Sequence, residues 1–382
     1  MMRPVVLVSV LAVGCGSSPP STQDPDAPPG TGPDAPAEVA PLEVHALGVQ
    51  GFVLHHGSDT ILTAPMFTRQ STFEVGLNLP LPSDTGAVEA GLATVPLGDL
   101  RAIVSGHAHY DHFIDVPHIL AMAPGSVVYT NLTGRNILAA LAPDRPAGCT
   151  NTPAQPLARS RVIALDDALA SKVDYTNCPA QRPAGAPLEG SWIDVPGSHV
   201  RIMAFCSMHP DQIGPFHFGE GSIDSEQCEL PAAASGWLEG QTLAFLIDFL
   251  DDAGTPTFRV YYQDAPTNAP LGEVPPTLLA ERGVDLALLC VGSNDAVDNQ
   301  PTNAIANLQP RFVFSGHWED FFRSTSDPIQ PIPLLNLDLY VERAEAALPG
   351  SPDAPLLVDG APQSTRHVLV QPGTRLIVPP RR

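Results

Sequence analysis

The sequence predicts an α+β fold, and two observations support this. Several short apolar runs rich in β-branched residues end abruptly at Ser-Gly, Pro or a polar residue, which is typical of buried strands that stop at a turn. The chain has 382 residues, of which 43% are hydrophobic, so it can bury a large core. The sequence shows no internal repeat. We therefore expect one large domain with loop insertions, over residues 43–382.

The first 15 residues have the features of an export signal. Met1–Arg3 provides a short positive region, and Val5–Val13 is apolar but too short to span a bilayer. Ala12–Cys15 then resembles a bacterial lipobox, in which Cys15 is lipidated and becomes the new N-terminus. The alternatives are an ordinary signal peptide and a short anchor that is never cleaved. We expect a lipoprotein of the bacterial cell envelope, on the periplasmic or outer-membrane face.

Residues 16–42 are predicted to form a disordered tether. They are rich in Pro, Ser, Asp and Gly and contain few large apolar side chains. Such a segment cannot bury enough surface to fold and acts as an extended linker. We expect it to connect the lipid anchor to the folded domain.

Four metal-competent side chains lie within one short segment. The apolar run 100–105 leads directly into His107, His109, Asp111 and His112, so a strand would hold them on the loop that precedes a helix. Three imidazoles and one carboxylate suit a borderline-soft divalent cation such as zinc. A chance cluster of solvated polar residues is the alternative. The strand context and the three segments described next favour a metal site.

Three later segments repeat the arrangement of a strand followed by a metal-competent side chain. These side chains are His209, Asp264 and His317, and each follows an apolar run with strand character. The runs that precede them are 200–206, 258–263 and 311–315. Each of the three alone is more often structural than functional. Together with the first segment they predict one site built from four strand ends.

The order His-x-His-x-Asp-His after a strand, followed by His209, Asp264 and His317, resembles the signature of the metallo-β-lactamase superfamily. The resemblance covers residues 44–325 and implies a four-layer αβ/βα metallo-β-lactamase sandwich with loop insertions. Further strands expected from it are 48–54, 60–65, 240–247 and 284–292. These features look most like the branch that contains ascorbate-phosphate lactonases and N-acylphosphatidylethanolamine phospholipase D-like enzymes.

The resemblance implies a site for two divalent metal ions, with Zn²⁺ expected and Mn²⁺ or Fe as alternatives. Seven residues are assigned as ligands: His107, His109 and His209 for the first ion, Asp111, His112 and His317 for the second, and Asp264 bridging the two. Oxygen-reducing di-iron relatives place a Glu where this chain has His109. The ligand set therefore favours hydrolysis over redox chemistry.

Two such ions lower the pKa of a water between them to about 7, which provides a hydroxide that attacks a carbonyl or phosphoryl centre. The expected activity is hydrolysis of a small ester, lactone, amide or phosphodiester. Asp111 is the candidate catalytic residue, because it can both ligate a metal and orient the nucleophile. His217 follows His209 closely and is a candidate for the substrate pocket or for protonating a leaving group. A β-lactamase proper and a non-catalytic metal-binding surface lipoprotein are the alternatives.

The formal net charge of −22 limits the partners. Nucleic-acid binding depends on Lys and Arg that replace counterions of the phosphates, and a strongly acidic protein repels phosphate polymers. We expect a small-molecule substrate, no nucleic acid, and contact with a membrane only through the N-terminal anchor.

Of the six cysteines, five follow Cys15, and export would place these in an oxidising compartment. Two expected disulfides each bracket a loop: Cys149 with Cys178, and Cys206 with Cys228. The spacing alone does not fix this connectivity, and Cys206 as a metal ligand is the rival interpretation. Cys290 lies in a strongly apolar run, so we expect a buried free thiol.

Segments 73–96 and 143–196 are expected to be long loops near the metal cleft. The first is rich in Pro, Gly and small residues, and the second is polar and Pro-rich. Long loops over a cleft usually decide substrate choice, and a purely structural connector is the alternative for each.

Overall fold

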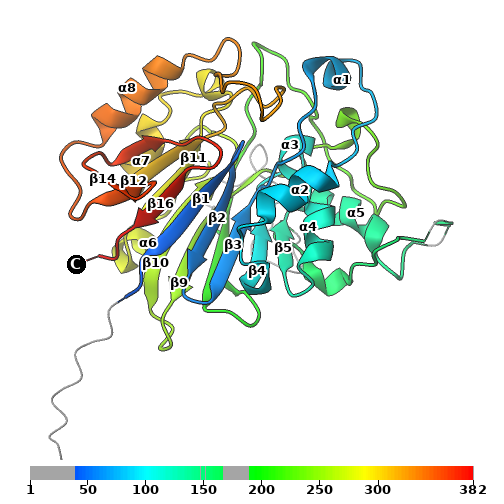
Figure 1. Ribbon diagram of the computed structural model, residues 1–382, viewed down its shortest axis with the longest axis horizontal. Coiled ribbons are helices and arrows are strands. Elements are labelled where there is room, and N and C mark those ends of the chain that lie inside the picture. Colours follow the sequence, from blue (N-terminus) through cyan, green and yellow to red (C-terminus); the bar gives the residue numbers. More distant parts are fainter. Residues whose placement is uncertain (1–38, 147, 151, 167–188, 382) are drawn as a thin grey trace, which may run out of the picture. The chain divides into compact units, whose positions relative to one another are not determined.

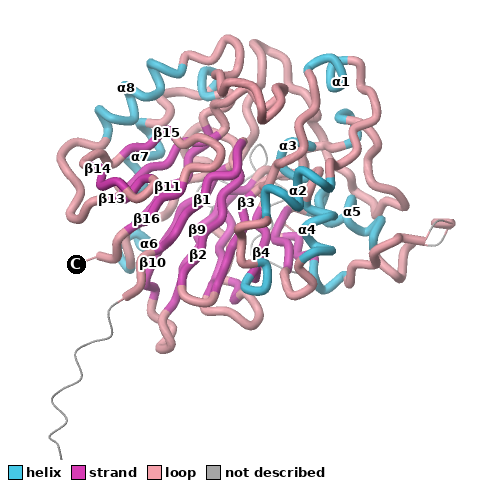
Figure 2. Tube along the Cα trace, in the orientation of Figure 1, coloured by secondary structure: helices cyan, strands magenta, loops and turns pink. Residues whose placement is uncertain are grey.

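Two large β-sheets form the centre of the structure (Figures 1 and 2). The computed structural model describes residues 39–146, 148–150, 152–166 and 189–381. Within these residues, the larger sheet contains nine strands in the order β14 (Ala361–Gln363), β13 (Leu356–Val358), β16 (Arg375–Val378), β1 (Leu42–Gly48), β2 (Gly51–His56), β3 (Asp59–Thr63), β4 (Leu100–Val104), β5 (Val127–Thr130) and β6 (Val162–Ala164).

The smaller sheet has seven strands in the described part of the chain. Their order is β15 (His367–Leu369), β12 (Phe312–Gly316), β11 (Leu286–Cys290), β10 (Pro256–Gln263), β9 (Leu243–Leu250), β8 (Val200–Cys206) and β7 (Ile193–Asp194). The two sheets enclose a hydrophobic core that includes Val44, Leu54, Phe245 and Phe314. Nearly all of β9 is buried, as expected for a strand that is covered on both faces.

Helices cover the outer face of each sheet. On the nine-stranded sheet these are α2 (Thr85–Leu92), α4 (Val116–Met122) and α5 (Leu132–Leu138). On the seven-stranded sheet they are α6 (Pro276–Glu281), α7 (Thr302–Leu308) and α8 (Leu337–Ala347). A separate hydrophobic cluster lies between each sheet and its helices, so the molecule has four layers. The predicted α+β class and αβ/βα sandwich are confirmed.

The strand ends that carry the predicted site residues lie at common edges. Strands β3, β4 and β5 run parallel to one another. In the other sheet β10, β11 and β12 are parallel, and β8 and β10 are both antiparallel to β9. The carboxyl ends of β8, β10 and β12 therefore point the same way. The four strands predicted to precede site residues correspond to β4, β8, β10 and β12 within two residues at either end.

The expected loop 73–96 contains two helices instead. Helix α1 (Thr72–Gly76) starts with a reciprocal capping box between Ser71 and Glu74, and Asp84 caps α2 through the backbone N–H of Ala87. These helices are short, so they show no long apolar period. Their capping residues mark where these helices begin, and the prediction of a loop did not take those residues into account.

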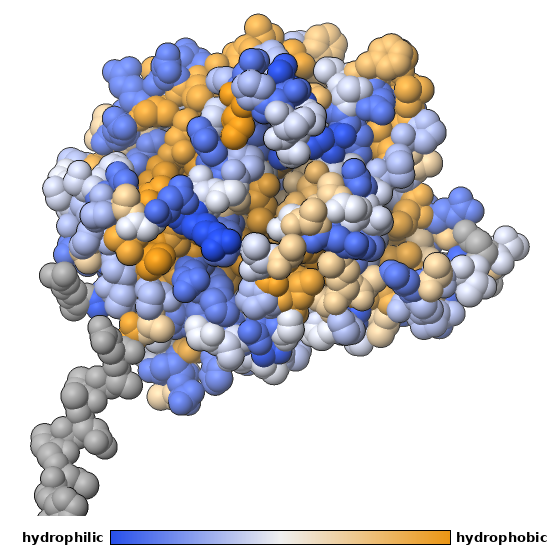
Figure 3. Space-filling model, in the orientation of Figure 1, coloured by the Kyte–Doolittle hydropathy of each residue, from blue (hydrophilic) through white to orange (hydrophobic). Residues whose placement is uncertain are grey.

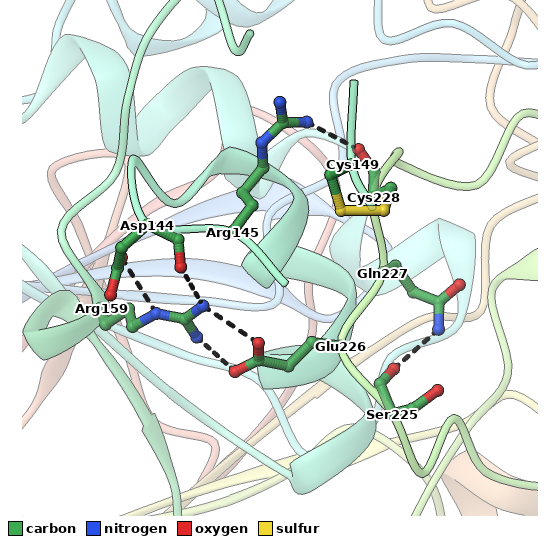
Figure 4. The surroundings of a disulfide bond; sticks show 8 residues. All are labelled: Asp144, Arg145, Cys149, Arg159, Ser225, Glu226, Gln227 and Cys228. Carbon is green, nitrogen blue, oxygen red and sulfur yellow. Dashed lines mark hydrogen bonds and ion pairs between the residues drawn. A yellow bond between two sulfur atoms is a disulfide. The ribbon is translucent and has the colours of Figure 1, made fainter. Parts of the chain in front are cut away.

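Both expected disulfides are wrong. Cys149 is bonded to Cys228, 79 residues further along the chain, with Cα atoms 5.2 Å apart (Figure 4). Cys206 also belongs to a disulfide, which excludes it as a metal ligand, and Cys178 lies outside the described residues. The error has a physical reason, because the fold places Arg145 and Cys149 beside Cys228, far along the chain. The prediction that Cys290 is a buried free thiol is confirmed.

The predicted signal peptide, the lipobox with Cys15 and most of the tether lie within residues 1–38, outside the described residues. Strand β1 begins at Leu42, so the last residue of the predicted tether belongs to the first strand. Among the described residues, no helix has the length and apolar character needed to cross a bilayer.

Candidate metal centre

The metal-competent motif lies where β4 ends and α3 (Tyr110–Phe113) begins. The loop is fixed by three hydrogen bonds. Ser105 Oγ donates to the carbonyl of His107 at 2.8 Å, Gly106 N to Asp264 Oδ2 at 2.6 Å, and Ala108 N to the carbonyl of Glu239 at 3.0 Å. Gly106 is required here, because a Cβ would lie 2.3 Å from the carbonyl oxygen of Leu243. These backbone contacts thus fix the position of the motif.

A first ligand group consists of His107, His109 and His209. One ring nitrogen from each lies within 4.8 Å of the others, and the ring centroids are 4.6 to 4.9 Å apart. His209 comes from the loop after β8 and the other two from the loop after β4. The two sheets therefore contribute jointly to this group.

Each of these imidazoles has one nitrogen committed to the protein. His107 Nδ1 contacts Asp264 Oδ1 at 3.0 Å, His109 Nε2 contacts the carbonyl of Gly219 at 3.2 Å, and His209 Nδ1 contacts the carbonyl of Pro210 at 2.7 Å. A nitrogen that donates to oxygen leaves the other nitrogen as a lone pair. The buried His107 Nε2 has no hydrogen-bond partner. The arrangement fits a metal that accepts one nitrogen from each ring.

A second group consists of Asp111, His112 and His317. Asp111 Oδ2 lies 3.4 Å from His112 Nε2 and 3.3 Å from His317 Nε2. His317 follows β12 and has a left-handed backbone with φ of 59°, held by a hydrogen bond from its N–H to the carbonyl of Val49 at 2.6 Å. This conformation is costly for a non-glycine residue and is typical of functional sites.

Burial keeps most of the imidazoles uncharged. It lowers the pKa of His109 and that of His112 to about 3, and it brings the pKa of His209 well below its usual range. Burial alone would raise the pKa of the Asp111 carboxyl, but His112 and His317 hold it well below its ordinary value. Neutral imidazoles and an ionised carboxylate are the states in which these side chains bind metal ions.

Asp264 belongs to neither ligand group. Its carboxylate contacts His107 Nδ1 and the backbone N–H of Gly106, so in this structure it orients a ligand and supports the motif loop. This is the arrangement in which an outer carboxylate fixes the tautomer of a ligating imidazole. A bridging role for Asp264 stays a prediction.

His217 lies beside the first group, and its partner is a residue that the sequence did not single out. His217 Nε2 contacts Glu239 Oε2 at 2.7 Å, and its ring is 5.5 Å from that of His209. Glu239 also accepts the backbone N–H of Ala108 and the side-chain amide of Asn131 through its carbonyl. Glu239 precedes β9 in a polar loop and gives no sequence signal, because only the fold brings it to the motif.

Comparisons with known proteins found no sequence match and several solved structures of low similarity. No family model and no curated protein sequence matches the chain. Among solved structures, the metallo hydrolase Igni18 from the archaeon Ignicoccus hospitalis is 14% identical and covers 88% of this chain and 98% of its own, with a TM-score of 0.42. YhfI from Bacillus subtilis, a metallo-β-lactamase fold protein, is 10% identical over 88% of this chain and 99% of its own, with a TM-score of 0.44.

A further similar structure, the diiron β-hydroxylase CmlA from Streptomyces venezuelae, is 11% identical over 90% of this chain and 54% of its own, with a TM-score of 0.43. A hydrolase and a hydroxylase thus appear among proteins of comparable similarity, so these likenesses assign no activity to this chain.

Proposed function

We propose that this protein is a metal-dependent hydrolase with a dinuclear site. One observation carries the proposal: two three-residue ligand groups, largely buried, adjoin at the ends of strands from both sheets. Divalent ions bound there would supply Lewis acidity and a water of lowered pKa at neutral pH. Zn²⁺ suits the imidazole-rich first group, and Mn²⁺ or Fe is compatible with the same donors.

The residues of this chain have distinct tasks in that reaction. The hydrogen bonds to Asp264, Gly219 and Pro210 fix the ring orientations of the first group. The Asp111 carboxylate faces both histidines of its group, so it is placed to accept a proton from an attacking water and orient it. Burial excludes bulk water and strengthens these interactions.

The substrate we propose is a small ester, lactone, amide or phosphodiester with an apolar part. The loop after His209 exposes Ile213, Phe216 and Phe218, and the last two rings are stacked with centroids 6.4 Å apart. Figure 3 shows further apolar surface in the region of α1, whose Phe73 is exposed. A net charge of −22 disfavours polyanionic substrates and nucleic acid. The lactonase and phospholipase D-like branch is our finer expectation.

The test combines metal analysis with a substrate panel. We expect two divalent ions per chain in the full-length protein, and a loss of bound metal in His107→Ala and His317→Ala. His118→Ala is the matched control, since His118 lies on α4 and its side chain pairs with Glu89. The panel contains p-nitrophenyl acetate, δ-valerolactone, bis-p-nitrophenyl phosphate and nitrocefin.

Each outcome of this test is informative. Hydrolysis that requires metal and both histidines supports the proposal. Turnover of nitrocefin alone favours a β-lactamase proper. Stoichiometric metal with no hydrolysis of any panel member contradicts the proposal and favours a non-catalytic metal-binding protein.

We also propose that the chain is exported and anchored by a lipid on Cys15. The support is the apolar segment and small residues before Cys15 and the polar, Pro-rich segment after it. Wild-type protein is then expected in the membrane fraction with incorporated palmitate. Cys15→Ser is expected to lose the label. Equal labelling of both proteins would contradict the proposal.

A further inference from the structure

A cavity lies away from the predicted metal ligands, on the outer helical side of the nine-stranded sheet. It has a volume of about 520 Å³, and none of the predicted metal ligands lines it. Its walls come from the segment before α2, the start of α4, and residues 154–155 and 230–232. A volume of this size falls within the usual range of about 300–1,000 Å³ for small-molecule sites.

The described lining is mostly apolar and contains no carboxylate, lysine or arginine side chain. Leu81, Ile114, Pro117 and Leu230 contribute to it, and the described residues around the cavity include no Asp, Glu, Lys or Arg. Two of its polar side chains already have partners: Ser83 Oγ donates to Asp115, and His118 Nε2 contacts Glu89. A charged ligand would therefore lose its hydration without gaining a counter-charge.

Trp237 contributes apolar ring surface to the wall. The side chain is 2% exposed, packs edge-on against Phe113 at a centroid distance of 6.4 Å, and lines the cavity. Its Nε1 atom is buried away from solvent, so the ring offers the cavity apolar contact and no hydrogen bond.

A disulfide bond joins the chain segments that lead into two of the cavity walls. Residues 154–155 and 230–232 follow the two cysteines of the Cys149–Cys228 disulfide. Arg145 donates to the carbonyl of Cys228 at 3.2 Å, and Arg159 pairs with Glu226 and Asp144 (Figure 4). A preformed and rigid wall reduces the ordering cost of binding.

We propose that this cavity is a second binding site, for a small uncharged molecule with an apolar body. The apolar lining, including the Trp237 ring, takes the body of the ligand. This site is independent of the proposed hydrolase chemistry.

The test uses Prodan, a neutral naphthalene ketone whose fluorescence shifts to the blue in an apolar site. We expect saturable binding of one Prodan per full-length chain, unchanged when EDTA removes bound metal. Leu230→Trp fills the cavity and is expected to weaken binding at least tenfold. Leu334→Trp is the matched control, because Leu334 is 89% exposed and lies outside the cavity.

Competition tests the charge preference. Methyl 2-naphthoate is expected to displace Prodan, and 2-naphthoate, which carries a carboxylate on the same rings, to do so at least tenfold more weakly. The proposal is overturned if Prodan does not saturate, if EDTA abolishes its binding, or if Leu230→Trp binds as tightly as Leu334→Trp.

Discussion

Single residues decide whether the metal-binding motif can form. At Gly106 the backbone passes so close to Asp264 and β9 that a Cβ would lie 2.4 Å from Asp264 Oδ1. Because Asp264 also holds His107, a side chain at this position would disturb a ligand through its supporting carboxylate. The chemistry of the site thus depends on a residue that has no functional group.

We expect Gly106→Ala to lower metal affinity at least tenfold and stability by about 1–3 kcal/mol, since the loop must shift away from Asp264. Metal content after dialysis and urea unfolding measure the two effects. Gly98→Ala is the control, because a Cβ at Gly98 meets no atom within 4 Å. Equal metal content in the two variants would show that the loop tolerates the change.

A buried histidine outside the metal centre makes stability depend on pH. His367 on β15 is 5% exposed and contacts Ser315 Oγ at 3.0 Å, and burial lowers its pKa from 6.5 to about 4. Between pH 6.5 and about pH 4, the His367 side chain is largely protonated in the unfolded chain and largely neutral in the folded chain. The free energy of unfolding therefore falls as the pH drops through this window, by about 3 kcal/mol from this group.

The variant His367→Gln should lose less stability over that window, because glutamine keeps a polar group and does not titrate. Urea unfolding of wild type and variant at pH 7, 5.5 and 4.5 measures the difference. His199→Gln serves as control, since its side chain is half exposed. Parallel pH profiles for wild type and His367→Gln would contradict the expectation.

At the scale of the elements, the strands were predictable and the short helices were not. Apolar, β-branched runs that stop at a turn make strands β4, β8, β10 and β12 recognisable in the sequence. The predicted metal ligands follow these runs. Helix α1 has five residues, too few for a periodic pattern, so only the Ser71 cap marks it. Glu239 was missed for a related reason, because its neighbour in space, Ala108, is far away in sequence.

The seven-stranded sheet holds a buried ion pair that ties β9 to β10. Asp248 and Arg259 are almost fully buried, and Arg259 Nε and Nη2 donate to Asp248 at 2.7 and 2.8 Å.

We expect Asp248→Ala to lose about 3–5 kcal/mol of stability, because the Arg259 guanidinium stays buried without the carboxylate that pairs with it. Asp252→Ala, at a fully exposed carboxylate, should change stability by less than about 0.5 kcal/mol. Urea unfolding compares the two, and equal midpoints would contradict the assignment.

At the scale of the whole molecule, the disulfide connectivity could not be read from the sequence. Cysteine spacing reports distance along the chain, whereas a disulfide requires Cα atoms about 4.4–6.8 Å apart in space. The four-layer fold brings Cys149 to Cys228 across 79 residues. The overall layers were predictable because the ligand order pointed to a known architecture, and the loops between them were not.

We expect removal of this bond by Cys149→Ala/Cys228→Ala to cost about 2–4 kcal/mol, because the unfolded chain regains the freedom of a long loop. Metal content should not change, since neither cysteine contacts a ligand group. Urea unfolding and metal analysis measure both quantities. Peptide mapping under non-reducing conditions provides the direct check, and a peptide joining Cys206 to Cys228 would contradict the structure.

The two ligand groups have a consequence for the lifetime of the protein. Each group takes residues from the loop after β4 or from helix α3, which follows that loop, and one histidine that follows a strand of the other sheet, so each ion would cross-link the two sheets. An ion at a hundred times its dissociation constant adds about 2.7 kcal/mol to the stability of a chain that binds it only when folded. If metal binds there as proposed, a cell short of metal would therefore hold a less stable protein, and not merely a less active one.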